Sequence, residues 1–499
     1  ILIGVLIGIA GSILFTVAAT AATPIKGLIA ILGLIAAIAM FLSPEIAVTV
    51  LCLSLPFERI GRLTDDADTV AVSASRILGL IALASLLLHC GLKKRKLYFE
   101  LPLWLFGGYV VVGALTNAWA LVPKETYRET FRIFGNLLFF FFIINVIRDY
   151  VSAKRAVVVW LIASLAAAGY SLGDYYYSRG ASIAESQMGL QSTRSSTTVM
   201  DLAEERTLGT GVRRLFGTTA HPTLFGLNMT MTVPFLFWAI RREDGLLKVL
   251  WIGGLGLAVA SILLSNTRAV LLLAVGTVIF CLIRGLWRPT VFSTLALAIA
   301  GLAAAPFVPK DVYKRILDPA LYSSGKGDAI RVRFKLLEKS WDLIGVYWTR
   351  GIGVGNQTTL QEMVTDENTG YLSTQGLKAS SHNEFVWVMV EVGIVGYVFF
   401  WSFVFLVTRA SFNASSLIRK ARGCADDYWF TIACQALLIG IPLFALQSET
   451  FHYPLKGWWL IAPIACTMER VARQVLRERE RVARQPLPEN VAWQERLAI

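Results

Sequence analysis

The sequence predicts an all-α polytopic membrane protein with about 12–14 transmembrane helices. Of the 499 residues, 55% are hydrophobic and only 16% are charged, whereas soluble domains carry roughly 25% charged residues. The apolar residues form long continuous runs, such as 249–264 and 385–407, close to the ~20 residues that a helix needs to cross ~30 Å of hydrocarbon. A soluble enzyme, a coiled coil, a disulfide scaffold and a membrane β-barrel are therefore excluded, the last because the runs do not alternate.

Fourteen apolar runs are interpreted as helices, because only helices satisfy their own backbone in lipid. The first run is kept as a span, because it is too long for the core of a signal peptide and lacks a clear cleavage pattern. The runs lie near residues 1–22, 25–43, 45–57, 76–91, 101–119, 131–147, 156–175, 222–240, 249–264, 269–285, 290–308, 385–407, 429–447 and 455–469.

Lys and Arg in short loops indicate the orientation of these runs. Basic clusters follow the fourth, sixth, eighth, tenth, twelfth and fourteenth runs. A single orientation satisfies all of them, with both termini in the cytoplasm. The expected units are N-terminal spans, a first external loop, central spans, a large external loop with short amphipathic helices, C-terminal spans and a basic cytoplasmic tail, over residues 1–175, 176–221, 222–308, 309–384, 385–469 and 470–499.

The net charge of +13 is attributed to basic cytoplasmic loops rather than to nucleic-acid binding. The large external loop is also basic, and loops longer than ~60 residues are exempt from the charge rule, so its cations indicate an anionic partner. The tail helix 469–484 either lies on anionic membrane lipid or is a solvated charged helix. The six cysteines match no zinc pattern, and residues 65–68 are interpreted as a solvated acidic loop, so no metal or cofactor is expected.

His382 has the strongest context for acid–base chemistry among the four histidines. It lies in the polar sequence 380–384, whose capping residues come directly before the run 385–407 and predict a helix start at the membrane surface. A neutral imidazole at the mouth of the bundle can accept a proton from a hydroxyl nucleophile. The alternative is a histidine that only anchors a helix at the interface. His221 and His452 map to the same external face and are candidates for supporting positions.

Three arginine positions are candidates for anion binding. Arg268 lies in the very short external turn 265–268, where a cation either snorkels to the surface or meets a bound anion. A guanidinium group binds phosphate through two parallel hydrogen bonds and stays charged at all relevant pH values. Arg213 and Arg214 precede the eighth run, and this pair is a second candidate unless nearby glutamates balance it.

The large external loop contains a predicted helix and a glycine-rich turn. Apolar residues recur at three- and four-residue spacing over 334–344, which predicts a helix with Arg331 on another face. The glycines of 351–356 have no strand-then-helix context, so a tight turn is predicted rather than a nucleotide site. Glu391 is an intramembrane carboxylate, which either supports the site near His382 or pairs with a polar side chain of a neighbouring helix.

Several of these motifs occur together in the order and spacing of a known family. The chain between about residues 210 and 410 resembles the O-antigen ligase and O-antigen polymerase superfamily. The motifs that carry the resemblance are Ser265-Asn266-Thr267-Arg268, Arg331 with Gly351-Ile352-Gly353-Val354-Gly355, Ser381-His382-Asn383-Glu384-Phe385 and Glu391-Val392-Gly393-Ile394-Val395-Gly396. The first 200 residues are similar only in their many spans, and the family more often has fewer spans than the fourteen counted here.

The resemblance implies a GT-C-like glycosyltransferase of the bacterial inner membrane, with its active site facing the periplasm. Such enzymes take a glycan from undecaprenyl diphosphate. Ligases pass it to a lipid A–core oligosaccharide, and polymerases pass it to another carrier-linked repeat unit. By matching motif positions, His382 is the expected catalytic residue, and Arg268, Arg331 and one of Arg213 or Arg214 are the expected diphosphate ligands.

The residues fit this chemistry independently of the resemblance. Arginines can stabilise a lipid diphosphate as charge develops on it, without a metal. His382 can assist the attack of a sugar hydroxyl, and a single displacement inverts the anomeric carbon. A ligase is the leading prediction; a polymerase shares the donor, fold and site. A secondary transporter is disfavoured, because it would bind its substrate near the bilayer midplane.

Overall fold

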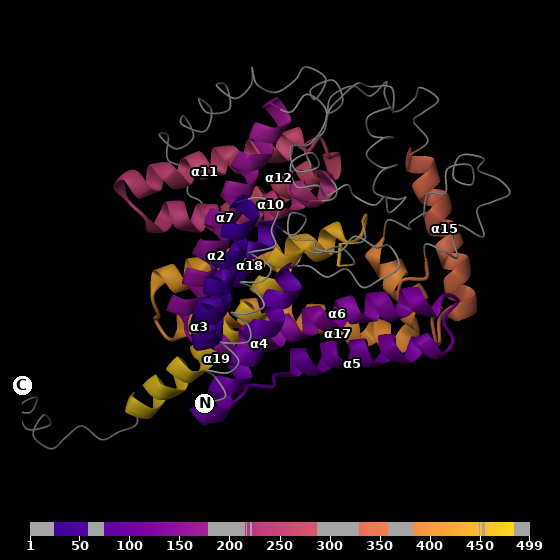
Figure 1. Ribbon diagram of the computed structural model, residues 1–499, viewed down its shortest axis with the longest axis horizontal. Helices are drawn as coiled ribbons and strands as arrows, with labels where there is room; N and C mark the ends of the chain where they lie inside the picture. Colours follow the sequence, from indigo (N-terminus) through magenta and orange to yellow (C-terminus); the bar gives the residue numbers. More distant parts are fainter. Residues whose placement is uncertain are drawn as a thin grey trace, which may run out of the picture.

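The computed structural model describes residues 24–57, 74–177, 215, 217–219, 222–286, 329–357, 383–448, 450–451 and 455–483. Over these ranges the chain forms helices and turns and no strand. Seven of the described helices are long and apolar enough to cross a membrane. The chain is therefore an all-α polytopic membrane protein, as its composition predicts (Figure 1).

The helices follow the order of the predicted runs. The first half of the chain contains α2 (Pro24–Leu42), α3 (Pro44–Ser54) with η1 (Leu55–Phe57), α4 (Ala74–Leu92), α5 (Leu101–Leu115) with η2 (Thr116–Ala118), α6 (Pro123–Val146) and α7 (Tyr150–Tyr177). The second half contains α10 (Pro222–Arg242), α11 (Gly245–Leu264), α12 (Arg268–Ile283), α15 (Ala329–Tyr347), α17 (Glu384–Lys420), α18 (Ala425–Phe444) and α19 (Lys456–Ala483).

Twelve of the fourteen predicted runs are confirmed as helices, and the runs 1–22 and 290–308 lie outside the described residues. Several helices are longer than their runs. α6 begins at Pro123, α17 continues to Lys420, and α19 continues unbroken to Ala483. The reason is physical: hydropathy marks only the apolar part of a helix, and the backbone hydrogen bonds continue through polar residues beyond it.

Helix α17 folds back on itself, which the apolar run 385–407 did not predict. Gly393 has φ 66° and ψ −173°, a non-helical conformation that divides α17 into a first arm (384–392) and a second arm (394–420). The rings of Phe385 and Trp401 stack with centroids 3.7 Å apart, whereas residues sixteen apart in one straight helix are separated by about 24 Å. The expectation of one span over 385–407 is therefore wrong: the first arm packs back against the start of the second.

Charged contacts join the helix ends that the basic clusters assign to the cytoplasm. Arg95 pairs with Glu45 at 3.4 Å, and Arg470 pairs with Glu100 at 2.7 Å. Lys154 binds two aspartates of α18, Asp426 and Asp427, at 2.5 Å each, and Asp426 also accepts a hydrogen bond from the Trp238 indole at 2.7 Å. We call the opposite end, which carries the α5–α6 and α11–α12 turns and α15, the external end (Figure 1).

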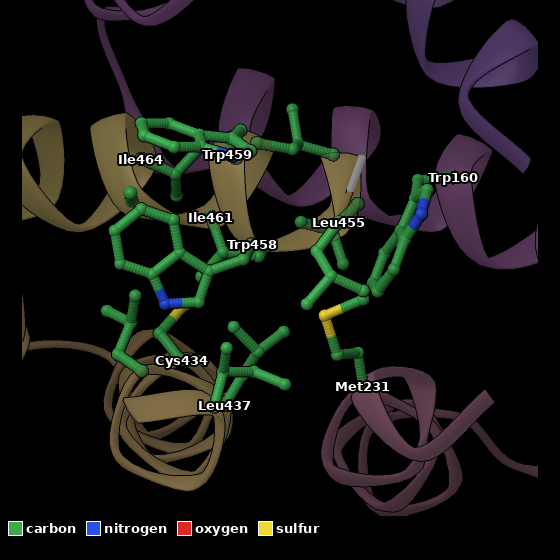
Figure 2. Close-up of a cluster of buried hydrophobic side chains, with 14 of the residues drawn as sticks. Trp160, Met231, Cys434, Leu437, Leu455, Trp458, Trp459, Ile461 and Ile464 are labelled. Carbon is green, nitrogen blue, oxygen red and sulfur yellow. The ribbon is translucent and has the colours of Figure 1, made fainter. Parts of the chain in front are cut away.

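Aromatic packing at the start of α19 fixes the middle of the bundle. Figure 2 shows Trp458 of α19 facing Cys434 and Leu437 of α18, with Met231 of α10 close to Trp160 of α7. Trp459 points to the other side of α19, where it packs on Phe106 with ring centroids 4.8 Å apart. A Cβ atom on Gly457 would lie 2.7 Å from the Trp160 ring, so this glycine permits the close approach of α7 and α19. This core holds α7, α10, α18 and α19 together beneath the external end.

Candidate functional site

The turn between α11 and α12 holds Arg268, the predicted anion ligand whose side chain the structure describes. Arg268 is the first residue of α12, and its Nε atom is buried. α10 packs closely against this turn, since a Cβ atom on Gly226 would lie 2.7 Å from Ser265 Oγ and 2.8 Å from Val270 Cγ1. The guanidinium group is thus attached to a tightly packed turn at the external end of the bundle.

Arg213, Arg214 and His221 lie outside the described residues, but their neighbours are held beside the same turn. The backbone N–H of Leu215, the residue after Arg214, donates to the carbonyl oxygen of Leu264 at 2.9 Å. Leu264 is the last residue of α11, directly before the turn that leads to Arg268. The chain at Leu215 is therefore anchored next to the Arg268 turn.

His382 also lies outside the described residues, and the residue that follows it begins α17. Asn383 is the N-cap of α17, because its side chain accepts from the N–H of Val386 at 3.1 Å. Its amide donates to the carbonyl oxygen of Leu446 at 3.0 Å, and the N–H of Glu384 donates to that of Ala445 at 2.8 Å. The predicted capping is confirmed, and the chain next to His382 is fixed to the end of α18.

The neighbour of His452 contacts the same arm of α17. Glu384 is fully buried, and its carboxylate accepts a hydrogen bond from the N–H of Phe451 at 3.1 Å. Phe451 immediately precedes His452, which lies outside the described residues. Glu384, two residues after His382, is therefore joined by one hydrogen bond to the residue before His452.

Helices α12 and α18 bring these anchor points to one level of the bundle. They pack side by side, and a Cβ atom on Gly440 would lie 3.2 Å from Leu273 Cδ1. Arg268 comes five residues before Leu273 on α12, and Ala445 comes five residues after Gly440 on α18. Each is therefore about 7.5 Å of helix rise from this contact. Arg268 and the Ala445 anchor of the His382 segment thus lie at the same end of the bundle.

Arg331 lies on α15, which confirms the helix predicted for the large external loop; its side chain is outside the described set. Leu343 of α15 packs with Val386 and Val390 of the first arm of α17. Arg331 is twelve residues earlier, about 18 Å along the helix. Figure 1 shows α15 beside the external ends of α5, α6 and α17, so this helix lies at the end of the bundle where the site is expected.

The predicted tight turn at 351–356 is confirmed, and its glycines are required by their conformations. Gly351, Gly353 and Gly355 have φ values of 70°, 103° and 80°, in the region that L side chains rarely adopt. A Cβ atom on Gly351 would lie 2.2 Å from the carbonyl oxygen of Glu391, and one on Gly353 would lie 2.6 Å from Ala120 Cβ. No side chain fits at these positions.

This turn fills the break in α17. The N–H groups of Ile352 and Gly353 donate to the carbonyl oxygens of Val390 and Glu391 at 3.0 Å each, and the N–H of Ile394 donates to that of Trp348 at 2.7 Å. The interrupted backbone of α17 therefore finds its hydrogen-bond partners in the loop. We call the pairing of residues 348–357 with 390–394 the glycine clamp.

Glu391 is the carboxylate at the centre of the glycine clamp. Its side chain is fully buried, and its Oε1 atom accepts a hydrogen bond from the N–H of Gly355 at 2.7 Å. The α5–α6 turn joins the same structure, since Asn356 accepts from the N–H of Val122 at 2.7 Å and donates to Thr126 Oγ1 at 2.6 Å. The described partner of Glu391 is thus backbone of the loop, a partner that the sequence did not indicate.

A small cleft beneath the first arm of α17 was missed from the sequence. Its empty space of about 260 Å³ includes space open to the surroundings, and four polar side chains line it together with five apolar or aromatic ones: Tyr109, Arg132, Asn136 and Glu384, with Phe106, Ile133, Phe400, Phe451 and Trp459. Arg132 also pairs with Glu129, one turn earlier on α6, at 2.6 Å. A signal was available, because Arg132 falls inside the predicted run 131–147, and an arginine within a span is a functional candidate by default.

Metal ligands are not grouped in the described part of the chain: no three His, Cys, Asp or Glu side chains there are arranged to hold an ion. The acidic sequence 65–68 lies outside it. The candidate site thus consists of Arg268, the hydrogen-bonded carboxylates of Glu384 and Glu391, and the fixed chain positions beside His382 and His452.

These features define a polytopic membrane protein with an arginine-bearing turn and a small cleft at one end of its bundle. Residues 253–401 match the family model of the O-antigen ligases. The match spans Arg268, Arg331, His382 and Glu391, and it supports the O-antigen ligase superfamily for this chain. No curated protein matches the chain significantly. The family is one of glycan-transfer enzymes, so the match supports the class that the motifs indicated.

Proposed function

We propose that the chain is an O-antigen ligase, which transfers a glycan from undecaprenyl diphosphate to a hydroxyl group of a lipid A–core oligosaccharide. The observation that carries this proposal is the family match over 253–401, because it includes Arg268, Arg331 and His382. The anchoring of Leu215 beside the Arg268 turn supports it, as does the anchoring of Asn383 to the end of α18.

The reaction is a single displacement at the anomeric carbon of the donor sugar. The bond from this carbon to the diphosphate oxygen breaks, the acceptor oxygen forms the new bond, and the configuration inverts. His382 accepts the proton of the acceptor hydroxyl. Arg268, Arg331 and one of Arg213 or Arg214 stabilise the leaving diphosphate, so the reaction as proposed needs no metal ion.

The glycine clamp and Glu391 position the site rather than react. The clamp holds the first arm of α17 against α15, and the chain enters that arm directly after His382. A fixed arm restricts where the imidazole can lie relative to the donor, and such positioning contributes to rate through orientation. Glu391 acts through its hydrogen bond to Gly355.

The location follows from the charge pattern. We place the protein in the bacterial inner membrane, with both termini in the cytoplasm and the external end in the periplasm, because every basic short-loop cluster then faces the cytoplasm. Its partners in this proposal are the carrier-linked donor, the lipid A–core acceptor and membrane lipids, with no nucleic acid.

The test is transfer in vitro by the purified full chain, with a lipid-linked glycan offered either core-lipid or a second carrier-linked unit. A ligase forms the core-linked product only; product on the carrier alone would identify a polymerase instead, and transfer to neither acceptor would refute a transferase. His382→Ala is expected to abolish transfer. His89→Ala is the matched control, because His89 lies at the other end of the bundle, where its ring bonds the Ser85 carbonyl at 2.8 Å.

A further inference from the structure

The side chain of Asn266, in the turn between α11 and α12, is buried and forms no hydrogen bond with any residue that the structure describes. The residue is 3% exposed, and neither its amide nitrogen nor its amide oxygen has a partner in the part of the chain that the structure describes. Leaving a buried polar group unsatisfied costs about 1–3 kcal/mol. A buried polar side chain that carries this energetic cost needs an explanation, and a bound ligand that forms hydrogen bonds with the amide provides one.

The conformation of the turn does not by itself explain this amide. Asn266 has φ 49°, a left-handed conformation that asparagine tolerates better than most residues. Glycine satisfies the same backbone without burying a donor and an acceptor. The N–H of Asn266 donates to the carbonyl oxygen of Leu263 at 3.0 Å, so the turn is closed by the backbone alone. The side chain has no role in closing it.

The amide lies next to the N-terminus of α12. Thr267 is the N-cap of this sixteen-residue helix but makes no side-chain capping hydrogen bond; its hydroxyl instead donates to the carbonyl oxygen of Ser265 at 3.1 Å. The first N–H groups and the dipole of a helix favour an anion at this end. Arg268 adds a full positive charge at the first helical position.

The cleft at this turn has a polar end and apolar walls. Its empty space of about 170 Å³ includes space open to the surroundings and leaves no enclosed room for a water molecule, so a ligand must enter from the open side; it is lined by Asn266, Thr267 and Arg268 together with Ile262, Leu263 and Leu271. An inorganic anion needs only the polar end. A prenyl diphosphate needs both, because its isoprene chain must leave the diphosphate against apolar side chains.

We infer that Asn266 binds the donor at the junction of diphosphate and sugar. Its amide nitrogen donates to a phosphate oxygen beside the N-terminus of α12, its amide oxygen accepts from a sugar hydroxyl, and the first isoprene units lie on Leu263 and Leu271. This inference rests on the proposed function for the identity of the donor. It adds a ligand residue and a binding direction that the arginines alone do not give.

The experiment measures binding without an acceptor, so that it does not depend on transfer. The purified full chain is titrated calorimetrically with geranylgeranyl diphosphate and, separately, with inorganic pyrophosphate. Asn266→Asp keeps the size and the tolerance of positive φ but repels an anion, and it is expected to weaken the binding of both ligands at least about tenfold. Asn266→Gly keeps the backbone and removes the amide, and a loss of roughly 10- to 100-fold is expected, the worth of one hydrogen bond to a charged group.

Asn117→Asp is the matched control, because it makes the same charge change at an exposed position of the external end; its affinities should equal those of the wild type. Leu271→Asn should weaken the binding of geranylgeranyl diphosphate and leave that of pyrophosphate unchanged. If Asn266→Asp and Asn266→Gly, monodisperse on gel filtration, bind as tightly as Asn117→Asp, the inference is wrong. Wild-type binding without transfer from a prenyl-linked glycan would refute the proposed function alone.

Discussion

The glycine clamp gives the sharpest test of the fold near the site, through the substitution Gly351→Ala. Gly351 has φ 70°, and a left-handed conformation costs a residue with a Cβ atom roughly 1–2 kcal/mol. The new Cβ atom would also lie 2.2 Å from the carbonyl oxygen of Glu391, a backbone atom that cannot turn aside. Overpacking of this kind costs typically 1–3 kcal/mol, so the clamp should lose about 2–5 kcal/mol.

Hydrogen–deuterium exchange of the purified chain measures this loss directly. At 1.4 kcal/mol for each factor of ten, exchange in the peptides covering 348–357 and 390–394 should accelerate roughly 30- to 4,000-fold. Glycan transfer should fall with it, because the clamp holds the arm that follows His382. Peptides from the opposite end, such as those around Lys154, should exchange at the wild-type rate.

Gly345→Ala is the matched control for this substitution. Gly345 lies on α15, six residues before Gly351, and a Cβ atom there would meet nothing within 4 Å. In a helix, Gly→Ala favours the folded state by up to about 1 kcal/mol. Exchange at 348–357 that is equally slow in Gly351→Ala and Gly345→Ala would refute the close packing on which the reasoning depends.

Three further outcomes are expected. Arg268→Lys should lower kcat/KM for transfer by at least about tenfold, because an ammonium group lacks the two-pronged geometry that phosphate binds; wild-type turnover would instead indicate simple snorkelling. Lys154→Met should lower the free energy of unfolding by about 2–3 kcal/mol. This is less than the loss expected when a fully buried ion pair is broken, because the two aspartates that Lys154 binds are 28% and 23% exposed. Lys248→Met, which breaks an exposed ion pair, should change the free energy of unfolding by less than ~0.5 kcal/mol, and denaturation of the solubilised protein measures both. The pKa of Glu100 is raised, because the effect of burial exceeds the opposing effect of Arg470. The stability of the wild type relative to Glu100→Gln should therefore be greatest below the pKa of an unfolded glutamate, about 4.3, and should decline as the pH rises through the raised pKa of the folded state. Melting temperatures of both proteins across this pH range test the sign.

The long apolar runs predicted the helices because hydrocarbon leaves the backbone no other partner. The glycine turn at 351–356 was predicted for a similarly local reason, since closely spaced glycines indicate left-handed backbone. A helix cap was predicted within 380–384 because these polar residues lie directly before an apolar run, and Asn383 caps α17. In each case the determining interaction lies within a few residues of the signal.

The fold-back of α17 was not predictable in this way. A run of apolar residues such as 385–407 is equally compatible with one span or with two packed arms, because hydropathy carries no direction. The break at Gly393 depends on partners about forty residues away, such as the carbonyl oxygen of Trp348. The partner of Glu391 is likewise distant, at Gly355. Such pairings are properties of the assembled bundle.

The short first arm of α17 also bears on when the site is completed during synthesis. Nine residues of helix rise only about 13.5 Å, too little to cross ~30 Å of hydrocarbon, so the second arm must make the crossing. The first arm is then held by contacts to Ala445, Leu446 and Phe451, which lie more than fifty residues later in the chain. The contacts that hold the first arm can therefore form only after the chain up to Phe451 has been synthesised.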